Sequence, residues 1–204
     1  WDWETIRELG LPEHIFTEID RAGTLRGHLR PELAKELGIN EASFAAVGTH
    51  DTASAVAAIP GTGSFAFCSS GTWSLFCVEP ILRDDVRSAN FSNEGTIQGG
   101  FRPLRNIMGL WLIQECRRDW IKAGHTYSWN EIVMEAEKAE PFRSIIDPDF
   151  GEFFAGGQMI EKIQSYCRNT DQPVPETVGQ IARCIYESLA LKYRWALERL
   201  EEIK

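Results

Sequence analysis

The string Thr49-His50-Asp51-Thr52 places an imidazole and a carboxylate side by side, where a predicted strand ends and a predicted helix begins. A general base that takes a proton from a substrate hydroxyl must sit on rigid structure beside the reacting atoms. Asp51 is therefore a candidate base. The alternative is that Asp51 only caps the helix, which is the commonest task of an aspartate in such a place. The residues alone leave both interpretations open.

A second candidate is the predicted turn at Ser70-Gly71-Thr72, which has further serines on both sides. Because Gly71 has no Cβ, a phosphate can approach the backbone N–H groups of the turn closely, and the Thr72 hydroxyl adds a donor. The alternative is an ordinary β-turn, since one glycine in a hairpin is weak evidence. The turn is not a P-loop, because the pattern GxxxxGK[ST] occurs nowhere in the chain.

Asn106 and Gln114 form a third candidate, at the start and in the middle of a helix predicted for residues 106–122. Their separation of eight residues corresponds to ~12 Å along the helix axis and to roughly 80° around it. One helix is thereby predicted to touch two parts of a substrate pair. The alternatives are a helix N-cap for Asn106 and a solvated side chain for Gln114.

Other catalytic and metal-binding arrangements find little support. His50, Asp51 and a serine could compose a hydrolase triad, but the chain has no Gly-x-Ser-x-Gly elbow. The five cysteines include no CxxC pair and have no histidine near them in sequence, so no metal site is assigned. Scattered, odd-numbered thiols predict a reduced protein of the cytoplasm.

The first quarter of the chain reads as short elements. Helical pieces are predicted within residues 1–40, one of them at 31–38 between a proline and a glycine. An apolar run at 44–48 predicts a short buried strand, and the small apolar residues at 52–59 predict a short helix. The candidate base would lie between these two elements.

The remainder reads as strands followed by helices. Runs at 64–69 and 73–78 predict a hairpin, and a third strand covers about 91–102 before the helix at 106–122. Apolar residues that recur every three or four positions from Val178 to Ile203 predict a long amphipathic helix. This order indicates an α+β fold in which an antiparallel sheet carries helices on its faces.

The composition excludes some function classes. The 204 residues carry a net charge of −9, which argues against nucleic-acid and anionic-membrane surfaces because both attract positive patches. Apolar stretches such as residues 107–113 are far shorter than the ~20 residues of a membrane span. The chain begins on Trp1 and stops at Lys204 inside a predicted helix, so both ends are expected to be cut.

Three uncommon strings, in order, resemble the FGGY family of carbohydrate kinases and within it the rhamnulokinase branch. The strings are Thr49-His50-Asp51-Thr52-Ala53-Ser54-Ala55-Val56, Ser69-Ser70-Gly71-Thr72-Trp73-Ser74-Leu75 and Asn106-Ile107-Met108-Gly109-Leu110-Trp111-Leu112. Weaker echoes occur at Asn93-Glu94-Gly95, Ile146-Asp147-Pro148 and Glu187-Ser188-Leu189-Ala190-Leu191. The resemblance covers nearly the whole chain.

The resemblance implies a sugar site and an ATP site. For the sugar, Asp51 would accept the proton of the 1-hydroxyl of L-rhamnulose, while His50, Thr52 and Asn106 would contact the ketose.

For the nucleotide, the resemblance implies that Thr72 and Gln114 bind ATP and that Gly71 shapes the turn around its phosphates. The γ-phosphoryl group would move from ATP to the sugar, with Mg²⁺ neutralising charge.

The resemblance also implies a two-lobed fold of the actin/hexokinase type. Residues 1–46 would be the end of the first, sugar-binding lobe. Residues 47–204 would be the front part of the second, ATP-binding lobe, an incomplete ribonuclease H-like α/β kinase fold with a mixed sheet and packed helices. The phosphate-binding glycine loop and the Gly-Gly-Gly adenosine segment of such kinases are not found. The missing lobes of the same polypeptide are therefore expected partners, and the chain alone is expected to be inactive and to self-associate.

Two alternatives stay open beside this interpretation. One is a related kinase that acts on another ketose, because sugar choice also depends on the first lobe. The other is a non-catalytic module that binds a sugar or a nucleotide.

Overall fold

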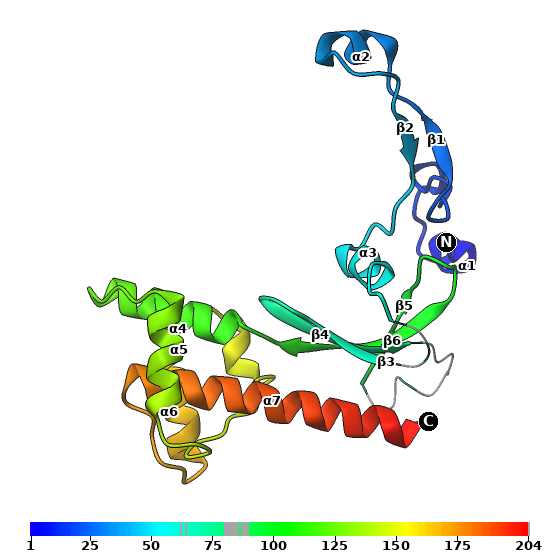
Figure 1. Cartoon of the computed structure of the whole chain (residues 1–204). Coiled ribbons are helices and arrows are strands. Elements are labelled where there is room, and N and C mark those ends of the chain that lie inside the picture. Colours follow the sequence, from blue (N-terminus) through cyan, green and yellow to red (C-terminus); the bar gives the residue numbers. More distant parts are fainter. Residues whose placement is uncertain (62, 64, 80–85, 87–89, 204) are drawn as a thin grey trace. The chain divides into compact units, whose positions relative to one another are not determined.

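The computed structural model describes residues 1–61, 63, 65–79, 86 and 90–203 (Figure 1). Contacts divide the chain into two compact units. Unit 1 comprises Trp1–Ile59 with Gly95–Gly100, and unit 2 comprises Pro60–Glu94 with Phe101–Lys204. These units are defined only by contacts within this chain. They do not test whether residues 1–46 and 47–204 belong to two different lobes, so that assignment stays a prediction.

Unit 1 is built from short elements. In chain order these are α1 (Trp3–Glu8), the 3-10 turn η1 (Glu13–Ile15), β1 (Leu25–His28), α2 (Pro31–Leu37), β2 (Ser43–Ala45) and α3 (Asp51–Ala57). Local chemistry sets the helix ends. Asp2 accepts a hydrogen bond from the Thr5 N–H at 3.1 Å, and Gly38 ends α2 with a positive φ of 66°. The helices predicted at 31–38 and 52–59 are confirmed to within two residues at each end.

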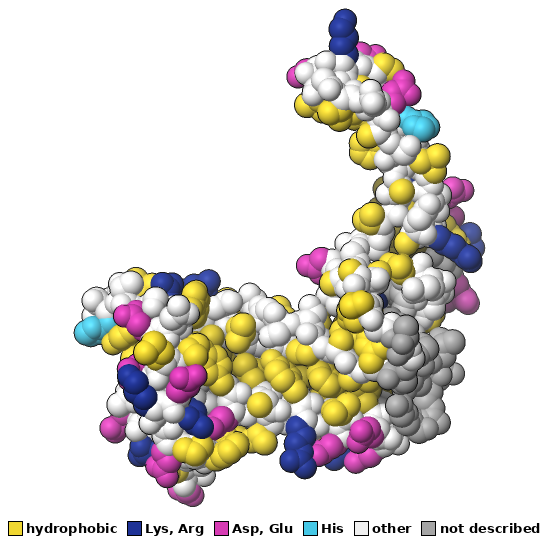
Figure 2. Space-filling view, viewed as in Figure 1, with side chains coloured by type: hydrophobic (Ala, Val, Ile, Leu, Met, Phe, Trp, Pro, Cys, Tyr) yellow, Lys and Arg dark blue, Asp and Glu magenta, His cyan; other side chains and the backbone are white. Residues whose placement is uncertain are grey.

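The two strands of unit 1 form an antiparallel ribbon, with Leu25 opposite Ala45. β1 lies where only helical pieces were expected, so that part of the prediction is wrong. The strand predicted at 44–48 exists, but its predicted burial is wrong, because Phe44 is 54% exposed. A two-stranded ribbon has no second layer of its own to bury a face. Apolar side chains consequently lie on the surface around β1, β2 and α2 (Figure 2).

Unit 2 contains a sheet with the strand order β3-β4-β6-β5. The strands are β3 (Phe65–Ser70), β4 (Trp73–Glu79), β5 (Ser92–Gly95) and β6 (Phe101–Met108). The β3–β4 and β4–β6 pairs are antiparallel, and Ser70 stands opposite Ser74. The predicted hairpin is therefore confirmed. Ser64, its predicted first residue, lies outside the described residues.

The single strand predicted for residues 91–102 is wrong, since β5 and the start of β6 share this stretch. The chain reverses between them. Gly99 has a φ of 86°, and its N–H donates to the Thr96 carbonyl at 3.1 Å. Glycine adopts this left-handed conformation without a steric penalty, which makes the turn possible.

The helices of unit 2 follow the sheet. They are α4 (Trp111–Lys122), α5 (Trp129–Lys138), the 3-10 turn η3 (Gly151–Phe154), α6 (Met159–Asn169) and α7 (Val178–Ile203). The predicted helix at Val178–Ile203 is confirmed at both ends. Figure 1 shows α7 extending from α5 and α6 along one side of the sheet. Its packing on α5 requires a glycine, because a Cβ on Gly179 would collide with the Glu135 carbonyl.

One hydrophobic core joins this sheet to the helices. Most of its members come from β4, β6 and the four helices, and these include Phe76, Ile107, Leu112, Ile113, Cys116, Ile132, Ile163, Ile185 and Leu189. Burying such side chains stabilises the fold by roughly 1.5–3 kcal/mol each. The predicted α+β fold class is confirmed, and the core fixes the hairpin, β6 and α4 within a single packed body.

Candidate active site

Asp51 is the first residue of α3 in unit 1, and His50 occupies the N-cap position without a side-chain capping bond. The Asp51 Oδ1 atom accepts hydrogen bonds from the Thr52 N–H at 2.7 Å and from the Thr52 hydroxyl at 3.4 Å. An N-cap aspartate instead accepts from an N–H two or three residues further along. The alternative that Asp51 is the N-cap is therefore wrong.

The Asp51 carboxylate faces solvent on a well-supported helix start. Its side chain is 98% exposed, whereas Thr52 is buried. The Ser54 hydroxyl donates to the Gly48 carbonyl at 2.9 Å, which holds the preceding loop against α3. The His50 Nε2 atom lies 3.9 Å from the Asp51 Oδ1 atom. This arrangement offers an accessible basic oxygen whose position is set by the neighbouring backbone.

The turn at Gly71 and Thr72 joins β3 to β4 and is tied to the start of α4. The Gly71 N–H donates to the Trp73 carbonyl at 2.8 Å, so this N–H is used within the hairpin. The Gly71 carbonyl accepts from the Leu110 N–H at 2.9 Å, and the Thr72 carbonyl accepts from the Trp111 N–H at 3.1 Å. The first N–H groups of a helix have no acceptor within the helix. Here the hairpin supplies two acceptors.

Gly109 lets the hairpin and the β6–α4 junction come this close. A Cβ on Gly109 would lie 2.6 Å from the Ser74 Oγ atom and 2.8 Å from both the Gly71 carbonyl oxygen and the Ser74 nitrogen. The Gly109 N–H donates to the Thr72 carbonyl at 3.2 Å. Any side chain at residue 109 would separate the two segments.

The structure brings Thr72 and Gln114 into direct contact. The Thr72 hydroxyl donates to the Gln114 Oε1 atom at 3.3 Å, across 42 residues of sequence. Thr72 is exposed and Gln114, in the first turn of α4, is half-buried. A hydroxyl and a side-chain amide in contact at an open edge can together hydrogen-bond a polar ligand.

Asn106 does not start a helix, so the prediction of one helix carrying both Asn106 and Gln114 is wrong. Asn106 lies within β6 and pairs with Leu75 of β4, and α4 begins only at Trp111. Pairing with β4 extends the strand to Met108, which a local sequence pattern does not reveal. Asn106 is exposed, on the same sheet face as Leu75 because opposed residues point the same way.

The predicted site residues thus fall into two groups. His50, Asp51 and Thr52 lie together at the start of α3 in unit 1. Gly71, Thr72, Asn106 and Gln114 lie in unit 2, on the β3–β4 turn, on β6 and on α4. In unit 1 the three residues are consecutive in sequence. In unit 2 the Thr72 hydroxyl contacts Gln114 across 42 residues.

Asp149 supports this region without having been indicated by the sequence pattern. Its Oδ1 atom accepts a hydrogen bond from the Met108 N–H at 2.9 Å. Its Oδ2 atom lies 3.1 Å from the Lys192 Nζ atom and 3.6 Å from the Arg105 Nη2 atom. Asp149 therefore fixes the end of β6 beside Asn106. The Asp-Pro-Asp sequence indicated only a turn, and nothing in it indicated a contact 41 residues away.

Within the described ranges, no group of three or more His, Cys, Asp or Glu side chains is placed to hold a metal ion. In the same part of the chain, no helix is both long enough and apolar enough to cross a membrane.

Comparison with known proteins gives a family match. Residues 66–204 match the C-terminal domain of the FGGY family of carbohydrate kinases. Similar proteins include the rhamnulokinases of Bacteroides thetaiotaomicron, 45% identical over 98% of this chain, and of Oceanobacillus iheyensis, 39% identical over 100%. The rhamnulokinase of Bacillus subtilis is 39% identical over 99% of the chain. The chain spans 41%, 43% and 42% of these three relatives, respectively.

Proposed function

This chain belongs to the FGGY family of carbohydrate kinases, and we propose that its complete gene product phosphorylates the 1-hydroxyl of L-rhamnulose with ATP. The observation that carries the proposal is the match of 98–100% of the chain to relatives named rhamnulokinase, at 39–45% identity. Membership of this family supports an ATP-dependent sugar kinase. The sugar and the roles of individual residues are the proposal.

On the sugar side, Asp51 acts as the general base. The exposed carboxylate takes the proton from the 1-hydroxyl as the oxygen attacks the γ-phosphorus, and the bond between that phosphorus and the β–γ bridging oxygen breaks. The products are L-rhamnulose 1-phosphate and ADP. His50 and Thr52 flank the base at the start of α3, and His50 is exposed enough to contact the ketose. Asn106 offers a side-chain amide to a sugar hydroxyl.

On the nucleotide side, the contact between Thr72 and Gln114 supports a common ligand. The Thr72 hydroxyl and the Gln114 amide bind ATP, and Gly71 shapes the turn beside the phosphates. Mg²⁺, when bound to the phosphates, neutralises charge that develops during transfer. The phosphates of ATP would carry this ion to the site, as is usual for Mg²⁺ in kinases.

The cysteines favour a reducing compartment for this reaction. All five are unpaired, and four of them are buried in unit 2. Buried, unpaired thiols persist where the thiol pool is reduced, and ATP is abundant in the same place. We therefore place the enzyme in the cytoplasm.

The proposal is tested with the complete gene product and an assay of ADP release coupled to NADH oxidation. L-rhamnulose, L-fuculose, D-xylulose and glycerol are compared by kcat/KM, with a reaction lacking sugar as the blank. We expect L-rhamnulose to lead, since polar side chains that stay unpaired with a wrong sugar reject it.

Each other outcome has a defined meaning. If another sugar has the highest kcat/KM, that sugar would replace L-rhamnulose as the proposed substrate, and the proposal of a sugar kinase would stand. An absence of sugar-dependent ADP release with all four sugars would contradict the proposed reaction and favour a binding module.

A further inference from the structure

Ser74 and Tyr193 form a buried link between the hairpin and α7. The Ser74 Oγ atom lies 2.6 Å from the Tyr193 hydroxyl oxygen, across 119 residues of sequence. Ser74 is completely buried. The Tyr193 ring is stacked on Phe76, with ring centroids 6.3 Å apart and an interplanar angle of 11°. Phe76 of β4 thus holds the Tyr193 ring. The Tyr193 hydroxyl reaches Ser74 on the same strand, two residues nearer the β3–β4 turn.

Ser74 is also the point at which the hairpin meets the β6–α4 junction. It pairs with Ile107 of β6, and its Oγ and backbone nitrogen are two of the three atoms that leave no space for a Cβ on Gly109. Gly109 in turn donates to the Thr72 carbonyl. A displacement of Ser74 would therefore be passed to Thr72 through two contacts, the strand backbone and Gly109.

The Thr72 side chain depends on such support. Its bond to Gln114 is 3.3 Å long, which is at the weak end for a hydroxyl donor, and Thr72 is exposed. Burial raises the pKa of Tyr193, so its hydroxyl stays protonated near neutral pH and can donate to Ser74. Removing that hydroxyl would leave the Ser74 Oγ atom buried without this partner, which costs more than losing an exposed bond.

We infer that Tyr193 is a positioning residue for the nucleotide, which acts through Ser74 to hold the Gly71–Thr72 turn where it meets ATP. The inference rests on the proposed function for the identity of the ligand. It assigns to α7 a role in ATP binding beside that of Gln114 on α4. In this inference Tyr193 acts through Ser74 and not through a contact with substrate.

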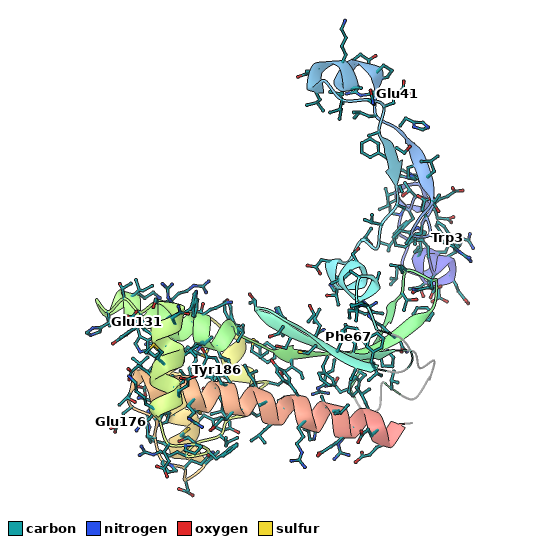
Figure 3. All side chains as sticks on the ribbon, viewed as in Figure 1. Trp3, Glu41, Phe67, Glu131, Glu176 and Tyr186 are labelled. Atoms are coloured by element: carbon teal, nitrogen blue, oxygen red, sulfur yellow. The ribbon has the colours of Figure 1, made fainter. Side chains whose placement is uncertain are left out.

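The test replaces Tyr193 by phenylalanine in the complete gene product. Tyr193→Phe keeps the ring that stacks on Phe76 and removes only the hydroxyl. The matched control is Tyr186→Phe, which is the same change on the same helix. Tyr186 is half-buried and lies toward the helical end of unit 2, away from Phe67 on β3 (Figure 3). Ser74→Ala and the double variant complete a double-mutant cycle.

Three quantities are measured for each variant. KM for ATP and KM for the sugar come from the coupled assay, and the Kd of ATP comes from titration calorimetry without sugar. Loss of one buried hydrogen bond predicts a rise of about three- to tenfold in both ATP constants for Tyr193→Phe. KM for the sugar stays within about twofold, and the double variant is no worse than the poorer single variant. Tyr186→Phe matches the wild type.

Other results overturn the inference. A merely structural role would lower the melting temperature of Tyr193→Phe while both ATP constants stayed unchanged. Equal changes in the ATP and sugar constants would also contradict it, as would additive single variants. If the wild type phosphorylates no sugar yet binds ATP, the proposed reaction fails while calorimetry still decides the inference. If the wild type binds no ATP, both fail.

Discussion

Replacing Gly109 by alanine should damage the hairpin and the nucleotide site together. The added Cβ would meet three atoms at 2.6–2.8 Å, and two of them, the Gly71 carbonyl oxygen and the Ser74 nitrogen, belong to the backbone and cannot rotate away. Forcing extra atoms into a packed site typically costs about 1–3 kcal/mol. The upper part of this range applies here. Moving the β6–α4 junction away from the hairpin would also weaken three hydrogen bonds between residues 109–111 and the Gly71–Thr72 turn.

A loss of about 2–3 kcal/mol in a domain of this size corresponds to a fall in melting temperature of roughly 4–12 °C. The assay is thermal unfolding of the complete gene product followed by fluorescence, with KM for ATP measured below the transition. The matched control is Gly151→Ala, since no atom lies within 4 Å of a Cβ built at Gly151 and its φ is not in the left-handed region. That control should change the melting temperature by less than about 2 °C. A Gly109→Ala variant as stable as the control, with unchanged KM for ATP, would refute the close-packing argument.

Three further predictions concern thiols and the isolated chain. Iodoacetamide at pH 8 should label Cys68 first in the native protein, because the other four thiols are buried, and mass spectrometry showing equal labelling of a buried thiol would contradict this burial. Burial raises the pKa of Cys77 to about 12, so the folded chain keeps this thiol protonated while the unfolded chain ionises from its ordinary value of 9.0. The free energy of unfolding should therefore fall as pH rises from about 9 toward 12, and urea unfolding should show a smaller fall for Cys77→Ala. The 204-residue chain alone should give no sugar-dependent ADP release and should scatter light as oligomers. Self-association is expected because β3 is an edge strand of the described sheet and because unit 1 exposes apolar side chains. An active monomer would contradict this.

The sequence predicted the elements whose signals are local. The long helix at Val178–Ile203 has an apolar stripe over its whole length, so its periodicity set both ends. The hairpin turn at Gly71 follows from two β-rich runs separated by turn residues. The candidate residues at the turn and on α4 could also be selected, because they occur in uncommon strings.

The errors came from contacts that are distant in sequence. Asn106 belongs to a strand because β4, about thirty residues earlier, pairs with it, and the local pattern was compatible with a helix start. The exposure of Phe44 depends on which layers are present to cover it. The bonds from Tyr193 to Ser74 and from Met108 to Asp149 cross 119 and 41 residues, and no spacing rule connects such positions.

The most direct test of the account is the turnover of Asp51→Asn in the complete gene product. Asparagine keeps an oxygen that can accept from the Thr52 N–H, so the helix start stays intact while the basic oxygen is lost. We expect kcat to fall by about 10²–10⁴-fold while KM for ATP and KM for L-rhamnulose change little. Asp171→Asn is the matched control, because Asp171 is exposed and has a φ of 52° that asparagine tolerates, and it should retain wild-type kcat. A loss of less than about tenfold for Asp51→Asn would show that Asp51 is not the base.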